Sequence, residues 1–304
     1  MRLLHVVDTI DPTRGVVSQA VRTMALEISK TGIYNEVLTL DAPGQEEQGT
    51  PYEVINVGPS RGPWSYSDAV VPWLIENLGR FDAIVIHGLW LYAGFAVKQA
   101  LSKIKKLYTA QHLKLPRLFI MPHGMLDPYF QISKNRRLKA LRNWIYWKLI
   151  EGKILNNADG LLFTCRQECI LAREPFKPYR PKQELIVGLG VSEPPGYNAA
   201  MINRLGTICP DLEYGSYILF LGRIDDKKGV DLLLKAYDKL LKNAYDSFNN
   251  ILADGKVLRR RQQDASLKQF PKLLIAGPGM DSTYGDKLRE LINESPVLKA
   301  HVSI

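Results

Sequence analysis

The chain has 304 residues, enough for two domains at roughly 150 residues each. Hydrophobic residues make up 46% and charged residues 23%, with 23 Gly and 18 Pro, which excludes a disordered or fibrous chain. The net charge is +9, and the excess lies in residues 98–190, a block suited to phosphates, anionic lipid head groups or nucleic acid.

Short β-rich runs alternate with helical stretches from the N-terminus onward, which predicts a parallel sheet with helices on both faces. We expect seven strands, at 3–8, 36–40, 52–57, 83–87, 118–122, 160–164 and 184–187. We expect five helices, at 16–29, 67–77, 94–104, 135–155 and 167–173. These elements complete a doubly wound α/β domain over residues 1–195.

A second, shorter α/β series follows a loop rich in Gly, Pro and Ser at 188–197. We expect strands at 217–221, 273–276 and 297–304, and helices at 230–242 and 284–293. The polar segment 243–270, with three arginines at 259–261, is expected to be a surface excursion. Three strands leave one sheet edge and one face poorly covered, so we expect a partial domain over 196–304 in a chain truncated at its C-terminus.

The chain has no run of about 18 apolar residues, as a membrane span requires. Its apolar start ends at Asp8, too early for a signal peptide. The three cysteines, Cys165, Cys169 and Cys209, lack the partners of a zinc site, which favours buried free thiols in a reducing compartment. We therefore expect a cytoplasmic protein.

The turn after the first predicted strand contains Gly15, directly before the helix at 16–29. A glycine there lets an anion approach the backbone at the helix N-terminus. A plain tight turn is an equally good interpretation, and a dinucleotide-binding glycine fingerprint is absent.

In the second domain, Gly222 and Arg223 end a predicted strand, and Lys228 precedes a helix. A guanidinium fork, an ammonium group and a helix N-terminus together suit a diphosphate, and we favour this over a solvated basic loop. The next strand ends in a glycine turn that suits a nucleotide pocket and a plain turn about equally: Gly277, Pro278 and Gly279.

Two predicted strands end in His-Gly, at His87 and at His123. A single histidine at a strand end is usually structural. Because carboxyl ends of parallel strands share one edge of a sheet, the pair indicates a site. The other histidines, His5, His112 and His301, have no such setting.

Taken together, these segments resemble the GT-B glycosyltransferases, specifically glycosyltransferase family 4. The resemblance rests on five segments in order: HGLW at 87–90, PHGMLDP at 122–128, the stretch from Ala158-Asp159-Gly160 through Thr164 to Glu168, FLGRIDDKKG at 220–229 and IAGPG at 275–279. It implies a GT-B-like fold of two doubly wound Rossmann-type domains facing across a cleft. Residues 1–195 would be the acceptor-side domain, and 196–304 a partial nucleotide-sugar donor domain.

The resemblance also implies roles for individual residues. His123 would be the catalytic histidine near the transferred sugar, and the donor diphosphate would meet Arg223, Lys228 and Gly15. The nucleotide pocket would be formed by Gly222, Gly277, Pro278 and Gly279, and the acceptor side by His87, Trp90 and Asp127. The implied reaction retains anomeric configuration and uses the nucleotide-sugar as substrate, with no cofactor and no metal.

The chain departs from the family pattern in three places. Gly15 is followed by Val16 where paired glycines are usual, and Gly188-Leu189-Gly190-Val191 stands where relatives have Pro-Asn-Gly-Val. The E-x7-E motif is absent, as is the C-terminal helix that crosses back to the first domain. Because that motif contacts the donor sugar, we expect negligible turnover from residues 1–304.

The basic segment 133–148 combines cations with Trp144, Ile145 and Trp147. It has two interpretations of equal weight. It is either a helix that lies on anionic membrane at the inner face, or a core helix with a basic outer surface and its aromatic residues against the sheet.

The leading functional hypothesis is sugar transfer from a nucleotide-sugar to a polysaccharide or glycolipid, with a saccharide or lipid-linked acceptor. The second is a non-catalytic remnant that binds an acceptor or partner, favoured by the missing E-x7-E motif. The third is a basic nucleic-acid-binding protein. Only the positive charge supports it, and we expect no nucleic-acid partner.

Overall fold

The computed structural model describes residues 1–304 except 45–48, 134–135, 211, 213–216 and 254–269. Contacts within the chain divide it into two compact units, Met1–Pro194 (unit 1) and Pro195–Ile304 (unit 2). Each unit has a parallel sheet and helices, so the α/β class expected from the alternating pattern is confirmed.

In the part of unit 1 that the structure describes, seven parallel strands form one sheet in the order β3-β2-β1-β4-β5-β6-β7. The strands are β1 (Arg2–Val6), β2 (Tyr34–Thr39), β3 (Glu53–Asn56), β4 (Ala83–His87), β5 (Arg117–Met121), β6 (Gly160–Phe163) and β7 (Glu184–Ile186). Every predicted strand of this domain is present, with ends displaced by no more than two residues. All of β4 is buried, as its apolar run requires in the middle of a sheet covered on both faces.

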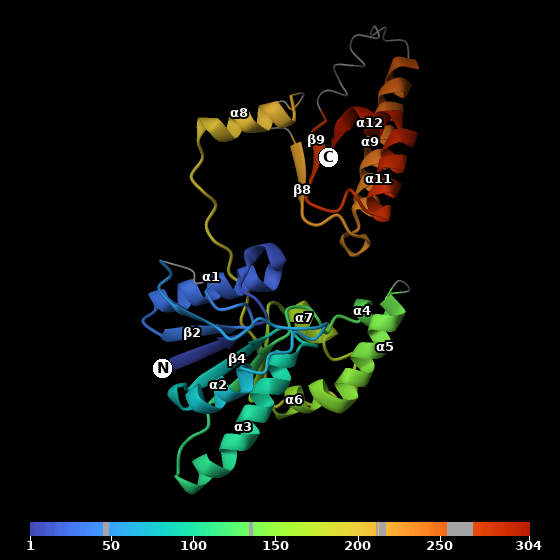
Figure 1. Cartoon of the computed structure of the whole chain (residues 1–304). Coiled ribbons are helices and arrows are strands. Elements are labelled where there is room, and N and C mark those ends of the chain that lie inside the picture. Colours follow the sequence, from blue (N-terminus) through green and yellow to red (C-terminus); the bar gives the residue numbers. More distant parts are fainter. Residues whose placement is uncertain (45–48, 134–135, 211, 213–216, 254–269) are drawn as a thin grey trace. The chain divides into compact units, whose positions relative to one another are not determined.

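Helices cover both faces of this sheet. They are α1 (Val16–Lys30), α2 (Val70–Asn77), α3 (Tyr92–Ala110), α4 (Tyr129–Ile132), α5 (Arg137–Tyr146), α6 (Gly152–Asn157) and α7 (Arg166–Leu171), with short 3-10 turns η1 (Pro12–Arg14) and η2 (Leu78–Arg80). Figure 1 shows α1 over one face and α2 and α3 over the other. Strand residues alternate between these faces: Ile84 packs in the core beneath α2 and α3, whereas Val85 packs with residues of α1.

The predicted helix at 135–155 is divided into α5, a π-helical segment η4 (Trp147–Glu151) and α6. Within it, Trp147 is 1% exposed and stacks on Phe176 with ring centroids 4.8 Å apart. Trp144 and Ile145 remain about half-exposed, so of the three apolar residues only Trp147 is buried in the core. Residue 135, the first of the predicted helix, lies outside the described residues.

Replacing Trp147 with Ala should destabilise unit 1 by about 3–5 kcal/mol, because a fully buried ring is lost and a cavity remains. Trp144→Ala, on the same helix but half-exposed, should change the unfolding free energy by no more than about 0.5 kcal/mol. Urea unfolding followed by circular dichroism measures both. Equal effects of the two substitutions would contradict this assignment of the buried face.

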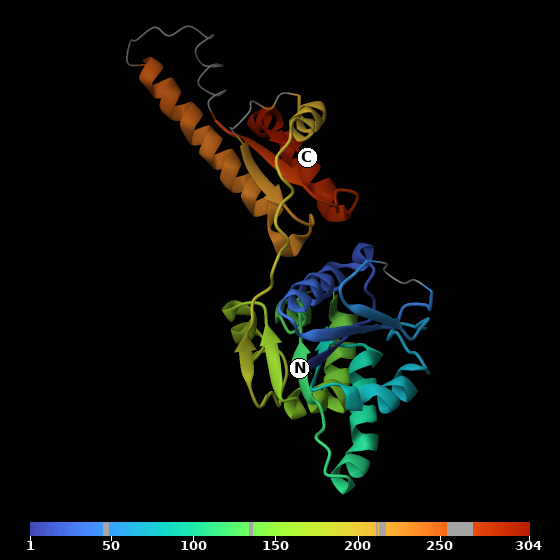
Figure 2. The same cartoon turned by 90° about the vertical axis from the view of Figure 1, so that its left-hand side faces the viewer.

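The described residues of unit 2 form three parallel strands in the order β10-β9-β8: β8 (Tyr217–Leu221), β9 (Lys272–Ala276) and β10 (Val302–Ser303). Its helical elements are α8 (Ala199–Ile208), η5 (Asp226–Lys228), α9 (Val230–Ala253), α11 (Thr283–Glu294) and α12 (Pro296–His301). The long helix α9, orange in Figure 2, packs with Leu273 and Ile275 of β9 through Val230 and Leu234. The edge strand β8 has four exposed residues out of five, in line with the expected poor cover of this sheet.

Two predictions for unit 2 were wrong, the strand at 297–304 and the end of the helix at 242, and one helix was not predicted. The expected strand at 297–304 is the helix α12 followed by a two-residue strand, because Ser295 accepts the backbone N–H of Leu298 and Pro296 occupies the first turn. Helix α8, which Asn198 caps, was not predicted. Helix α9 runs to Ala253, into the segment expected to be a surface excursion, and the arginines at 259–261 lie outside the described residues.

The thiols also differ from expectation. All three cysteines are free, but Cys165 is exposed, Cys209 is half-buried and only Cys169 is buried. The Cys165 sulfur accepts the backbone N–H of Glu168 at 3.4 Å, which places it at the N-cap of α7. Among the described residues, no helix is long and apolar enough to cross a membrane.

Candidate functional site

Three histidines from adjacent strands of unit 1 form a hydrogen-bonded series, called here the histidine chain. His5 lies on β1, His87 ends β4 and His123 follows β5. The His5 Nδ1–His87 Nε2 distance is 2.9 Å, and the His87 Nδ1–His123 Nε2 distance is 3.0 Å. Since His87 occupies Nε2 of His123, Nδ1 is the ring nitrogen of His123 left for a ligand.

Parallel register explains how the chain forms. His5 pairs with Val85 across β1 and β4, and alternation places His87 on the same face two residues further along. Sequence reasoning found His87 and His123 but passed over His5, because no glycine follows it. One signal in the sequence could have identified His5. It lies on the first strand, and in a doubly wound sheet the first strand is the neighbour of the fourth strand, which carries His87.

Burial keeps the histidine chain uncharged. It lowers the pKa of His5 to about 4, and it lowers that of His123 to about 4 against an opposing effect of the Glu168 carboxylate. Burial, reinforced by the neighbouring rings, lowers the pKa of His87 well below its usual value. At neutral pH His123 therefore offers a hydrogen bond to a ligand and no positive charge.

The Glu168 carboxylate holds the turn that carries His123. It accepts the N–H of Gly124 at 2.6 Å and the N–H of Thr164 at 2.7 Å, which joins the turn after β5 to the end of β6. His123 and Gly124 have φ angles of 51° and 76°, so the turn is left-handed at both positions. The sequence pattern around Glu168 does not indicate its role, and the structure makes it a positioning residue.

The other site residues predicted in unit 1 lie in different settings. Gly15 has a φ of 143° and precedes α1, and a Cβ there would meet no atom of the described residues within 4 Å. The Asp127 carboxylate accepts the N–H of Tyr129 at 2.9 Å at the start of α4. Trp90 is 9% exposed and packs against Tyr146 and Phe176, and its N–H donates to the Glu151 carboxyl group at 3.3 Å.

In unit 2 the predicted donor residues lie on two loops that are tied together, called here the loop pair. Gly222 N–H donates to the Ala276 carbonyl at 3.0 Å, and Ile224 N–H donates to the Pro278 carbonyl at 2.8 Å. A Cβ on Gly277 would lie 1.9 Å from the Gly222 carbonyl oxygen, so this approach requires glycine.

The loop pair presents exposed cations at the start of α9. Arg223 and Lys228 are exposed, and within the described residues neither side chain makes an ion pair. Gly229 takes the left-handed conformation at the turn into α9. Among the first N–H groups of α9, that of Asp231 donates to the Tyr284 hydroxyl at 3.0 Å. The arrangement suits an anionic group next to a helix N-terminus.

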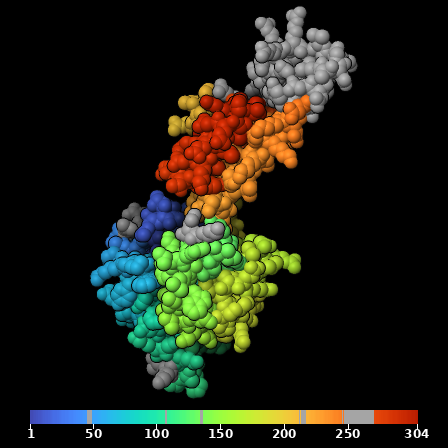
Figure 3. All heavy atoms as spheres, turned by 90° about the vertical axis from the view of Figure 1, so that its right-hand side faces the viewer, coloured from blue at the N-terminus to red at the C-terminus, as the bar shows by residue number. Residues whose placement is uncertain are grey.

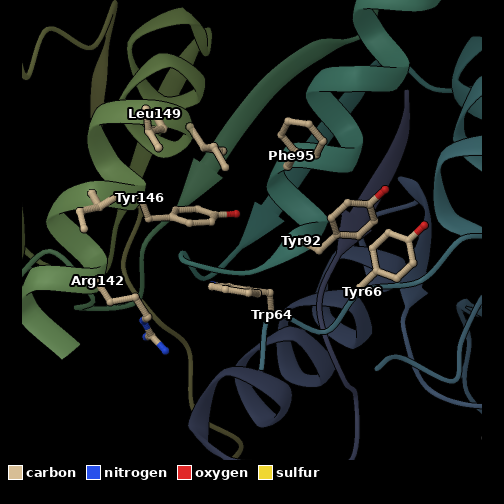
Figure 4. Close-up of a pocket in the computed structure, with 9 residues that line it drawn as sticks. Trp64, Tyr66, Tyr92, Phe95, Arg142, Tyr146 and Leu149 are labelled. Atoms are coloured by element: carbon tan, nitrogen blue, oxygen red, sulfur yellow. The ribbon is translucent and has the colours of Figure 1, made fainter. Parts of the chain in front are cut away.

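Unit 1 also contains a hollow of about 450 Å³, called here the aromatic pocket (Figure 4). It lies between the α5–η4 helix on one side and α3 with the loop at 61–66 on the other. Its lining residues are Trp64, Tyr66, Tyr92, Phe95, Arg142, Ile145, Tyr146, Leu149 and Ile150. Sequence reasoning missed this pocket, because its walls come from three separate segments.

The sequence model of the glycosyl transferase 4-like domain family matches residues 15–188, more than half of the chain. The chain belongs to the glycosyl transferase 4-like family. The match lies within unit 1, the part of the chain that holds the histidine chain and the aromatic pocket. No protein of curated function matches the sequence.

Solved structures of glycosyltransferases resemble this family member in fold. Anabaena HepE in complex with UDP-glucose is 12% identical with a TM-score of 0.52, covering 100% of this chain and 68% of that one. Trehalose-6-phosphate synthase of E. coli, bound with UDP-2-fluoro glucose, is 13% identical with a TM-score of 0.51, covering 99% and 70%. The sheet and helix arrangement is thus that of the Rossmann-like units of GT-B enzymes.

The histidine chain predicts an acid-sensitive unit 1. Unfolded histidines bind protons near pH 6.5, whereas His5 and His123 do so near pH 4 when folded, so the unfolding free energy should fall as pH drops from 6.5 to 4. His5→Phe removes one such group and should reduce the slope by up to about 1.4 kcal/mol per pH unit. Urea unfolding at several pH values measures the slope.

The matched control is His112→Asn, since His112 is exposed and Asn tolerates its φ of 58°. This change should leave the slope as it is. An unchanged slope in His5→Phe would show that His5 is not held neutral.

Proposed function

We propose that this chain is a glycosyltransferase, or a fragment of one, whose reaction transfers a sugar from a nucleotide-sugar donor to a polysaccharide or glycolipid acceptor, with retention of configuration and with neither metal nor cofactor. Membership of the glycosyl transferase 4-like family supports the reaction class. The observation that carries the donor assignment is the loop pair. It presents two exposed cations that have no ion-pair partner among the described residues, beside close-packed glycine turns.

In this proposal Arg223 and Lys228 bind the donor diphosphate, and Gly222 with the turn at 277–279 forms the nucleotide pocket. Breaking the bond between sugar and diphosphate places negative charge on the leaving group. Fixed cations stabilise that charge as it develops, and they require no reorganisation at the moment of reaction. For Gly15 the proposal is a phosphate contact at the N-terminus of α1.

The role of His123 follows from its neutral imidazole. With Nε2 occupied by His87, Nδ1 can hydrogen-bond a hydroxyl of the transferred sugar and hold it in orientation. Glu168 and His87 keep the ring in place. His87, Trp90 and Asp127 remain the residues proposed for the acceptor side, and all three act indirectly. Both ring nitrogens of His87 are occupied by His5 and His123, so His87 acts by orienting His123. Trp90 and Asp127 act through the loops that they stabilise.

A peripheral contact with anionic membrane, at its cytoplasmic face, is also part of the proposal. The residues that support it form an exposed apolar stripe on the α5–η4 helix: Leu138, Leu141, Ile145 and Leu149. Arg137, Lys139, Arg142 and Lys148 flank the stripe, and residues 128–150 contain no Asp or Glu. Figure 3 shows this light green segment on the outer surface of unit 1.

The donor assignment is tested by calorimetry with UDP, GDP and ADP. The double variant Arg223→Ala plus Lys228→Ala should lose at least about 100-fold in affinity, because each charge-assisted contact contributes roughly 1.5–3 kcal/mol. Lys235→Ala plus Arg289→Ala is the matched control, since it removes two exposed cations of the same unit that pair with Asp231 and Asp286. Undiminished nucleotide binding in the first variant would overturn the assignment.

A further inference from the structure

The aromatic pocket is polarised along its length. Arg142 lies at one end, beside Trp64, and Phe95 and Leu149 lie at the other (Figure 4). Arg142 and Leu149 are seven residues apart on one continuous helical run, which separates them by about 10 Å along its axis. The cation therefore marks one end of a hollow whose other lining residues are aromatic or aliphatic.

The polar groups around the pocket favour an anion at its cationic end. Arg142 donates to the Asn143 side chain at 3.1 and 3.3 Å, which leaves other guanidinium N–H groups for a ligand. None of the lining segments, 61–66, 88–95 and 137–150, contains an acidic residue. Glu151 follows directly, but burial raises its pKa to about 8, so this carboxyl group stays largely protonated at neutral pH.

The pocket also opens onto a surface that suits lipid. Leu149 and Ile145 belong both to its lining and to the exposed apolar stripe, at 64% and 45% exposure. Trp64 and Tyr66, on the opposite wall, are also about half-exposed. A hydrocarbon chain can therefore pass from the stripe into the pocket along continuous apolar surface.

We propose that the aromatic pocket binds the hydrocarbon chain of a lipid phosphate, with the phosphate at Arg142 and the chain running toward Phe95 and Leu149. A volume of about 450 Å³ lies within the roughly 300–1,000 Å³ typical of small-molecule sites. The guanidinium supplies the bidentate donors that a phosphate prefers.

The location of the pocket links this lipid to the transfer site. Only four residues separate His87, at the end of β4, from Tyr92 in the pocket wall. Within that loop Trp90 packs against Tyr146 of the opposite wall, with ring centroids 6.4 Å apart. The lipid is therefore assigned as the apolar part of the acceptor, and this assignment rests on the proposed function. The binding of a lipid phosphate in the pocket does not depend on the proposed function.

The test is binding of monomeric dodecyl phosphate to the full chain, by calorimetry and native mass spectrometry, with dodecanol and inorganic phosphate as comparison ligands. One equivalent of dodecyl phosphate should bind, and more tightly than either comparison ligand. Arg142→Glu should lower the affinity for dodecyl phosphate at least tenfold and leave the affinity for dodecanol unchanged. Leu149→Glu should lower the affinities for both ligands at least tenfold.

Leu138→Glu is the matched control, because Leu138 lies on the same stripe at 86% exposure but does not line the pocket. It should bind dodecyl phosphate as the parent chain does, while losing affinity for phosphatidylglycerol vesicles. If Leu138→Glu and Leu149→Glu lowered the affinity for dodecyl phosphate equally, the ligand would be adsorbing to the stripe alone, and the pocket site would be overturned. Binding of dodecanol as tight as that of dodecyl phosphate would also overturn it. Circular dichroism checks that each variant is folded.

Failure here is distinguishable from failure of the proposed function. Nucleotide binding through Arg223 and Lys228 uses unit 2, and none of the pocket substitutions alters that unit. Loss of nucleotide binding with intact dodecyl phosphate binding would leave a lipid-phosphate site without the donor assignment. The reverse result would overturn the pocket site alone.

Discussion

The parallel alignment of the strands in unit 1 is the constraint on which its chemistry depends. All seven strands deliver their carboxyl ends to one edge, and β1, β4 and β5 are neighbours there. Side chains 82 and 36 residues apart in sequence thereby come within hydrogen-bonding distance, His5 with His87 and His87 with His123. A different strand order would scatter these three imidazoles.

The two units carry different kinds of chemistry. In unit 1, burial removes the charge from the histidine chain, and the Glu168 carboxylate is used to hold backbone N–H groups of the His123 turn and of Thr164. In unit 2, the loop pair leaves Arg223 and Lys228 exposed and charged. A neutral hydrogen-bonding group suits a sugar hydroxyl, and paired cations suit a diphosphate, as the proposed transfer requires.

The π-helical segment η4 decides what the basic helix can do. Its wide turn seats Trp147 against Phe176 in the core, yet the stripe from Leu138 to Leu149 stays on the surface. The same helix thus anchors unit 1 and forms one wall of the aromatic pocket. Single π-helical turns inside α-helices frequently occur at functional sites.

The sequence by itself determined the strands of unit 1, the glycine turns and the candidate residues His87, His123, Arg223 and Lys228, because apolar periodicity and turn glycines are local signals. It could not identify His5 as the partner of His87, since that contact depends on strand order. It also misread 297–304, where a Ser295 cap and Pro296 outweigh an apolar run. The aromatic pocket was decided by tertiary structure alone, because packing brings together three segments that share no pattern in the sequence.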